Sequence, residues 1–185
     1  QHIFQVSKRW LDPNGDGDPS DGIDGFRLDV AAEMTLGFWR EYHAHVKSIN
    51  PDAYLVGEIW WELWPDDLID PSPWLQGDVF DAVMNYRWYR LSRRFFGQVG
   101  KKIGPTQFAK DLQELEKGFS RNNTLVMMNV AASHDSPRLG TSLSNPDKYK
   151  YNAHPGGDKQ YWIGKPTAHT KRIQKLLLLH QFTYQ

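Results

Sequence analysis

Hydrophobic positions along the chain form two kinds of segment. Short runs of consecutive apolar residues are typical of strands buried on both faces, and they occur at residues 23–31, 53–59, 79–84 and 125–130. Longer segments carry apolar residues every three or four positions, which indicates amphipathic helices. These segments lie at residues 1–10, 35–49, 87–96, 105–117 and from 170 onward. Strands that alternate with helices predict an α/β fold with a parallel sheet.

Local signals support these boundaries. Thr35 is placed to cap one helix, and Pro105 suits the first turn of another. Residues 60–76 are rich in Trp and Pro, and residues 136–167 are rich in Pro, Gly, Asn and Asp. Both stretches are therefore expected to be irregular loops.

The composition is neutral in charge and rich in tryptophan. Lys and Arg number 22 and Asp and Glu number 22, which argues against a nucleic-acid partner bound by general charge neutralisation. The chain has no Cys, so a disulfide framework and a thiol nucleophile are excluded. Runs of consecutive apolar residues such as 176–179 are far shorter than the roughly 20 residues of a membrane-spanning helix. The eight Trp suit either a core of large rings or a protein that binds sugars, which have apolar faces.

Charged residues follow the predicted strands. Arg27 and Asp29 end the first strand, Glu58 ends the second, and His134 and Asp135 follow the fourth. The carboxyl ends of parallel strands meet at one edge of a sheet or barrel. We therefore expect these five side chains to lie on one face.

Two carboxylates on neighbouring strands are what glycoside hydrolysis requires. Alternation along a strand places Arg27 and Asp29 on the same side, so the guanidinium can hold Asp29 ionised and aimed. Glu58 lies among apolar and aromatic residues, a setting that suits a protonated general acid. Each carboxylate taken singly fits a cap or a turn residue. Their occurrence at successive strand ends favours catalysis.

Three segments carry a family resemblance. Residues 24–31 (DGFRLDVA), 56–60 (VGEIW) and 129–136 (NVAASHDS) resemble signature segments of the alpha-amylase family of glycoside hydrolases. Residues 74–86 (WLQGDVFDAVMNY) are most similar to its neopullulanase and cyclomaltodextrinase branch.

The resemblance implies a role for each matched residue. Asp29 would be the nucleophile, Glu58 the general acid/base and Asp135 the stabiliser of the transition state. Arg27 would orient the nucleophile and His134 would contact the sugar. Two further residues near the cleft are candidate stacking platforms, Trp60 and Tyr86.

The resemblance also implies a fold and a mechanism. The fold would be a partial TIM (β/α)8 barrel, approximately strands four to seven with the helices between them. Residues 1–185 would form this single fragment of a catalytic domain, with no second domain. The mechanism would be retaining and act on alpha-1,4-linked glucans, with carboxyl groups about 5–5.5 Å apart and no organic cofactor. Because a complete barrel takes about 250 residues, we expect the isolated chain to be inactive.

Three alternative functions differ in the residues that they require. An alpha-glucan transglycosylase would use the same residues, and a non-catalytic carbohydrate-binding relative would have lost carboxylates that are present here. A nucleotide-binding domain needs a glycine-rich loop between a strand and a helix, whereas the glycine-rich segment here is acidic and precedes a strand. The exact alpha-glucan, the oligomeric state and the compartment (periplasmic, secreted or cytoplasmic) are left open.

An acidic, glycine-rich segment precedes the first strand. Oxygen-bearing side chains alternate with other residues at Asp12, Asn14, Asp16 and Asp18, which resembles a calcium loop. The twelfth position from Asp12 is Ile23, where an EF-hand would need Glu, so the loop is not an EF-hand. The alternatives are a Ca²⁺ site of another kind and a solvated turn capped by its own Asp side chains.

Overall fold

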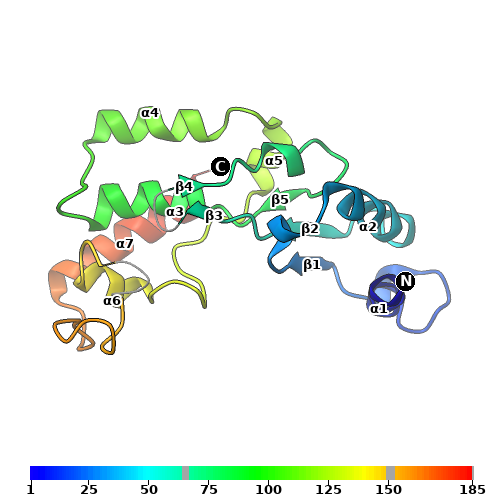
Figure 1. Cartoon of the computed structure of the whole chain (residues 1–185), viewed down its shortest axis with the longest axis horizontal. Coiled ribbons are helices and arrows are strands. Elements are labelled where there is room, and N and C mark those ends of the chain that lie inside the picture. The colour runs from blue at the N-terminus through cyan, green and yellow to red at the C-terminus, as the bar shows by residue number, and fades with distance from the viewer. Residues whose placement is uncertain (64–66, 149–152, 185) are drawn as a thin grey trace. The chain divides into compact units, whose positions relative to one another are not determined.

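The computed structural model describes residues 1–63, 67–148 and 153–184. The chain folds as two units (Figure 1). The first unit comprises residues Gln1–Trp60, Ile69–Met84 and Gly118–Met128, and the second comprises Trp61–Leu68, Asn85–Lys117 and Asn129–Gln185. No helix in the described residues is long and apolar enough to cross a membrane.

The first unit is built on a parallel sheet. Strands β1 (Gly25–Leu28), β2 (Tyr54–Gly57) and β5 (Ala82–Val83) lie in the order β1-β2-β5, all parallel. The register pairs Leu28 with Gly57 and Gly57 with Val83. The predicted fourth strand, residues 125–130, is reduced to an isolated parallel bridge between Met128 and Met84.

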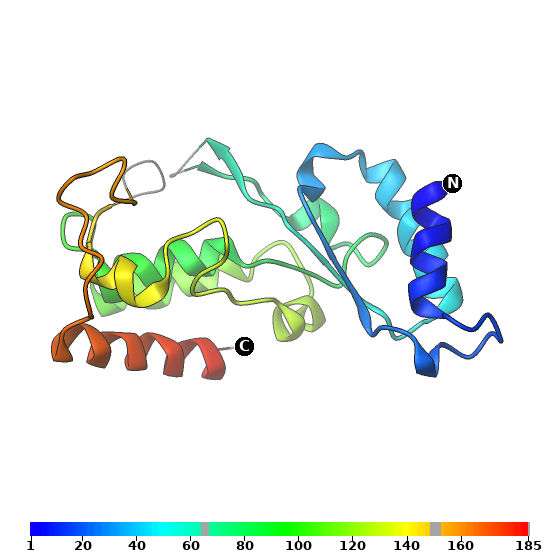
Figure 2. The same cartoon turned by 90° about the horizontal axis from the view of Figure 1, so that it is seen from below.

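Helices α1 (His2–Leu11) and α2 (Leu36–Ile49) were both predicted, and they lie side by side in Figure 2. Thr35 caps α2 by accepting a hydrogen bond from the Phe38 amide. The buried face of α2 joins apolar side chains of the sheet and of residues 75–80 in one core, so β2 is covered by a helix as the alternating pattern predicted.

A polar network joins the start of β2 to the residue before β5, to α2 and to Val126. The Asp81 carboxylate accepts hydrogen bonds from the Leu55 amide and from the Lys47 ammonium, whose Nζ is 3.1 Å from Oδ2. The neighbouring Tyr54 hydroxyl donates to the Val126 carbonyl at 2.7 Å. Burial, with the Asp81 charge second, raises the pKa of Tyr54 to about 12, so this hydroxyl keeps its proton and remains a donor.

The second unit is mainly helical. Its helices are α3 (Tyr86–Ser92), which continues as a π-helical turn (Arg93–Gly97), α4 (Pro105–Leu115), α6 (Leu139–Ser144) and α7 (Ala168–Thr183). Trp88 and Leu177 are fully buried where α3 and α7 contribute to a common core.

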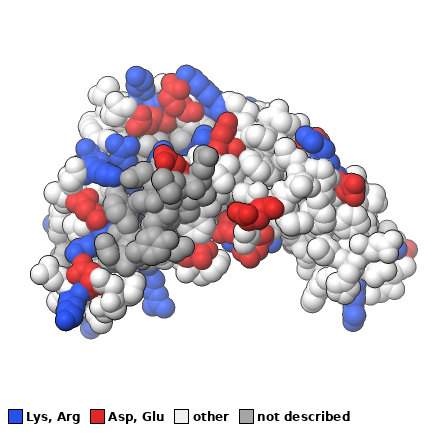
Figure 3. Space-filling view, viewed as in Figure 1, with Lys and Arg blue, Asp and Glu red and all other residues white. Residues whose placement is uncertain are grey.

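On the face that Figure 3 shows, Lys and Arg are interspersed with Asp and Glu, as expected for a chain of zero net charge.

Three predicted segments differ from the structure. Helix α5 (Arg121–Val126) replaces the start of the predicted fourth strand, because Ser120 and Asn123 form a capping box that begins a helix. Strands β3 (Trp61–Leu63) and β4 (Asp67–Leu68) pair antiparallel inside the predicted loop 60–76. Helix α6 forms inside the predicted loop 136–167.

Candidate active site

Two carboxylates meet at the carboxyl ends of neighbouring strands in the first unit. Leu28 pairs with Gly57 in the parallel register, so the next residues, Asp29 and Glu58, leave the sheet side by side. The Glu58 amide donates to the Leu28 carbonyl at 2.9 Å and extends the ladder to this level. The predicted convergence of Asp29 and Glu58 is therefore confirmed.

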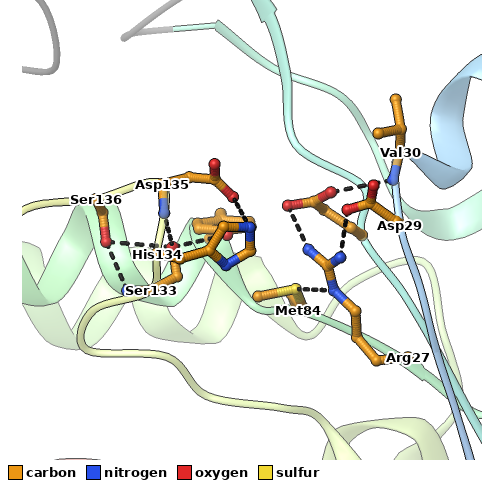
Figure 4. Close-up of polar contacts among 10 residues, drawn as sticks. Arg27, Asp29, Val30, Met84, Ser133, His134, Asp135 and Ser136 are labelled. Atoms are coloured by element: carbon orange, nitrogen blue, oxygen red, sulfur yellow. Dashed lines mark hydrogen bonds and ion pairs between the residues drawn. The ribbon is translucent and has the colours of Figure 1, made fainter.

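Arg27 joins the two carboxylates (Figure 4). Its Nη2 lies 2.8 Å from Oε1 of Glu58, and its Nη1 forms an ion pair with Oδ1 of Asp29. Its Nε donates to the Met84 sulfur at 3.4 Å, which fixes the plane of the guanidinium. Arg27 was predicted to orient Asp29 alone, and the contact with Glu58 was not predicted. Because one planar group bridges both carboxylates, it holds them close and in a defined mutual orientation.

The two carboxylates differ in exposure. The Glu58 side chain is 6% exposed, whereas that of Asp29 is 67% exposed. Glu58 is held on both oxygens, since Oε2 accepts a hydrogen bond from the Val30 amide at 3.0 Å. The predicted apolar setting of Glu58 is therefore correct for its burial and wrong for its polar contacts. Asp29 is open to an incoming ligand.

Local backbone features place these groups. Val30 has φ of 48°, a left-handed conformation that costs a β-branched residue free energy. That conformation accompanies the contact of its amide with Glu58. A Cβ at Gly57 would lie 2.3 Å from the buried ring of Phe80, so the residue before Glu58 has no room for a side chain.

The second unit holds the third predicted carboxylate. His134 Nε2 lies 3.0 Å from Asp135 Oδ2, and the two side chains are 70% and 31% exposed. The turn around them is held by two hydroxyls, because Ser133 Oγ accepts from the Asp135 amide and Ser136 Oγ accepts from the Ser133 amide (Figure 4). These two serines were not predicted. Their signal is the Ser-x-x-Ser spacing around the His-Asp pair.

The two predicted stacking residues, Tyr86 and Trp60, have different environments. Tyr86 is 2% exposed and its hydroxyl donates to Ser133 Oγ at 3.3 Å, so it supports the His-Asp turn instead of offering a stacking face. Trp60 is half-buried, and its carbonyl accepts from the Ile69 amide. Of the other Trp in the segment 60–76, Trp74 packs against the core of the first unit, and Trp64 lies outside the described residues.

The acidic loop uses its carboxylates on its own backbone. Asp12 is buried and accepts from the Gly15 and Gly17 amides. Asn14, Asp16 and Asp18 each accept from the amide two residues further on, the pattern of successive Asx turns. Nowhere in residues 1–63, 67–148 and 153–184 do three His, Asp or Glu side chains gather as a metal-binding group. This geometry fits the solvated turn, and calcium binding by the loop stays a prediction.

The chain is similar to known proteins over its whole length. Residues 1–155 match the model of the alpha-amylase catalytic domain. The whole chain is 39% identical, over 184 residues, to a cyclomaltodextrinase of a Bacillus species, of which it covers 26%. Over 151 residues, 81% of the chain, it is 38% identical to neopullulanase 2 of Thermoactinomyces vulgaris, of which it covers 23%. The chain therefore spans about a quarter of the length of these relatives.

The fold has solved counterparts. The type III pullulan hydrolase of Thermococcus kodakarensis matches 95% of the chain with a TM-score of 0.67 and 25% identity, over 26% of its own length. The small parallel sheet is thus part of the barrel fold that this class of hydrolase adopts.

Proposed function

Since the chain belongs to the alpha-amylase family, we propose that it carries the central catalytic segment of a retaining glycoside hydrolase acting on alpha-1,4-linked glucans. The observation that carries this proposal is the single guanidinium of Arg27 bridging Asp29 and Glu58. It supports a closely spaced carboxyl pair, which is the arrangement of retaining enzymes.

Exposure supports the division of roles. Asp29, open to solvent, is the nucleophile that attacks the anomeric carbon. Glu58, buried and held on both oxygens, gives its proton to the leaving glycosidic oxygen. The departing sugar leaves a covalent glycosyl ester on Asp29. Glu58, now ionised, takes a proton from water as that water attacks the anomeric carbon and releases Asp29.

The His-Asp turn completes the proposed machinery. Asp135 stabilises the positive charge that develops on the sugar ring, and His134 contacts the sugar hydroxyls. The Ser133 and Ser136 contacts support this role because they fix the backbone of the turn in a single conformation.

The proposal extends to the place of the chain in the barrel. We assign β1, β2, β5 and the Met84–Met128 bridge to strands four to seven, supported by their parallel order along the chain. The chain of 185 residues is shorter than the roughly 250 residues of a complete barrel. We therefore expect the isolated chain to be inactive and the full-length protein to be active.

Hydrolysis and transfer share every residue above and differ in the acceptor, which is water or a sugar hydroxyl. The names of the relatives, cyclomaltodextrinase and neopullulanase, support hydrolysis and suggest cyclodextrin, pullulan, starch or maltooligosaccharide as substrates. A non-catalytic carbohydrate-binding role is disfavoured, since the Arg27-bridged carboxyl pair is present.

The test is release of reducing ends by the full-length protein from cyclodextrin, pullulan and maltooligosaccharide. We expect activity on at least one, abolished in the Asp29→Asn variant. A full-length protein that is inert on every alpha-glucan contradicts the proposed function, and release by the isolated chain contradicts its expected inactivity.

Calcium binding by the Asp12–Asp18 loop stays a prediction. The Asx turns could open to turn side-chain oxygens toward a cation. Calorimetric titration with Ca²⁺ of the wild type and of Asp16→Ala tests it. A heat of binding that is present in the wild type and lost in the variant supports a calcium loop. If the wild type shows no heat of binding, the loop is a solvated turn.

A further inference from the structure

Trp162 stands apart from the other tryptophans. Among those whose side chains the structure describes, only Trp10 and Trp162 are more than half exposed, at 57% and 56%. The high tryptophan content therefore does not serve the core alone. The two exposed rings are in different settings.

Trp10 belongs to a helical stripe. It lies on α1 with Ile3 and Val6, which are also exposed, at the spacing of one helix face. Such a stripe is typical of a surface that packs against other protein. Trp162 lies instead in the segment between α6 and α7, next to the exposed Ile163 and near the exposed polar residues Gln160 and Lys165.

The backbone of Trp162 is clamped. The amide of Asn145, which is 4% exposed, donates to the Trp162 carbonyl at 2.8 Å, and its oxygen accepts from the Trp162 amide at 2.7 Å. The same segment is tied a second time by the ion pair between Asp158 and Lys148. The Lys148 contact, followed by the hydrogen bond from the Gln160 amide, lowers the pKa of Asp158, so this tie persists at neutral pH.

The indole is also supported from one side. A Cβ at Gly164 would lie 2.3 Å from Cζ2 and 2.6 Å from Cε2 of Trp162. The ring therefore rests where the side chain of residue 164 would be, and Gly is needed for this seat. An exposed aromatic ring with a fixed backbone and a fixed seat loses little entropy when a ligand covers it.

We propose that Trp162 is a stacking platform for one glucosyl unit of an alpha-glucan. The inference rests on the proposed function. A pyranose ring presents an apolar C–H face that suits a flat indole, and its hydroxyl rim suits the donors of Gln160 and Lys165. Along the chain, α6, six residues and about 9 Å long, lies between the Asp135 turn and Asn145, which holds the platform.

Hydroxyl-radical footprinting of the full-length protein tests the contact directly. The Asp29→Asn variant is exposed to radicals with and without saturating maltohexaose, and oxidation of each Trp is measured by mass spectrometry. We expect oxidation of Trp162 to fall at least threefold and oxidation of Trp10 to stay unchanged. Cellohexaose, of equal length but β-linked, is expected to protect neither.

Four variants in the same background test the mechanism. Trp162→Ala is expected to raise the Kd for maltohexaose about tenfold, which corresponds to about 1.4 kcal/mol. Trp162→Phe keeps a ring and is expected to recover most of the affinity. Gly164→Ala displaces the indole and is expected to weaken binding at an unchanged melting temperature. Trp10→Ala, equally exposed, is the matched control and is expected to bind as the wild type does.

The outcomes separate the two proposals. Unprotected Trp162, or unchanged affinity in Trp162→Ala, in a protein that hydrolyses alpha-glucans overturns the platform and leaves the proposed function standing. A protein that neither hydrolyses nor binds any alpha-glucan overturns both.

Discussion

The first unit holds two groups of acidic residues, one in the loop Asp12–Asp18 and one at the strand ends, and their partners differ. In the loop Asp12–Asp18, the side-chain oxygens accept hydrogen bonds from amides of the same loop. At the strand ends, Asp29 and Glu58 instead share the guanidinium of Arg27, which lies two residues before Asp29 and which the sheet register brings to Glu58. The number of acids is therefore a poor guide to chemistry.

What differs is the origin of the partners. Loop partners come from neighbouring residues, so they need only a turn. The partners of Glu58 are about 30 residues away in the chain, at Arg27 and Val30, and they require the folded sheet. A carboxylate that is buried against distant donors is a stronger indication of a site than one that caps its own loop.

Substitution of the two kinds of acid should give the largest contrast. Glu58→Gln is expected to lower kcat on maltooligosaccharide by about 10²–10⁴-fold, because the proton donor is lost. Gln keeps an acceptor for the Val30 amide, so folding is preserved. Asp18→Asn in the loop is the control and is expected to leave kcat unchanged. Equal effects in the two variants would break the comparison.

The second-largest expected effect is the loss of stability when Arg27, the cation shared by Asp29 and Glu58, is removed. Arg27→Ala leaves the buried Glu58 without its counterion, and the penalty of about 3–5 kcal/mol for breaking a buried pair is reduced to about 1–3 kcal/mol because Arg27 is 29% exposed. Hydrogen exchange in peptides over β1 and β2 measures the loss. Arg40→Ala removes an exposed pair with Asp78 and is expected to cost under about 1 kcal/mol. Matching losses would show that burial of Glu58 does not matter.

Within the loop Asp12–Asp18, substitution of the buried acid should destabilise the protein more than substitution of an exposed one. Asp12→Ala is expected to destabilise the loop by about 1–2 kcal/mol, because two amides lose an acceptor that is 6% exposed. Asp16→Ala, which is exposed, is expected to change stability by under about 0.5 kcal/mol. Exchange rates of the Gly15 and Gly17 amides report the difference, and faster exchange in Asp16→Ala than in Asp12→Ala would contradict it.

The smallest expected effect is a pH dependence of protein stability that comes from His180, outside both groups of acidic residues. His180 Nδ1 accepts from the Trp88 indole at 3.2 Å, and burial lowers the pKa of His180. The stabilisation from neutral His180 is present above its unfolded pKa of about 6.5 and is lost as pH falls through the lower folded value. Melting temperature should therefore decrease from pH 7.5 to 5.5, and less so in His180→Gln. An equal decrease in both would exclude this origin.

Much of the fold follows from local sequence. The Thr35 cap, the apolar runs at β1 and β2, and the α7 segment are each encoded by adjacent residues, and all were predicted. The antiparallel pair β3–β4 was missed because it lies in the Trp- and Pro-rich stretch 60–76, which is typical of a loop. Helix α5 was missed because its capping box uses Asn123 in place of the usual acidic residue.

The site divides in the same way. Asp29, Glu58 and Arg27 follow apolar runs and could be placed at strand ends from the sequence. The amide of Val30 could not, because its role depends on a left-handed backbone that no side-chain pattern encodes. The stacking prediction for Tyr86 failed because the packing of the second unit buries the ring.

The central claim is that Asp29 is a nucleophile held beside Glu58. Its most direct test is to trap the covalent intermediate in the full-length Glu58→Gln variant with an activated alpha-glucosyl fluoride, which needs no proton for its leaving group. We expect digestion and mass spectrometry to find one hexosyl unit on Asp29. A hexosyl unit on another residue, or product of inverted anomeric configuration with no labelled peptide, would contradict it.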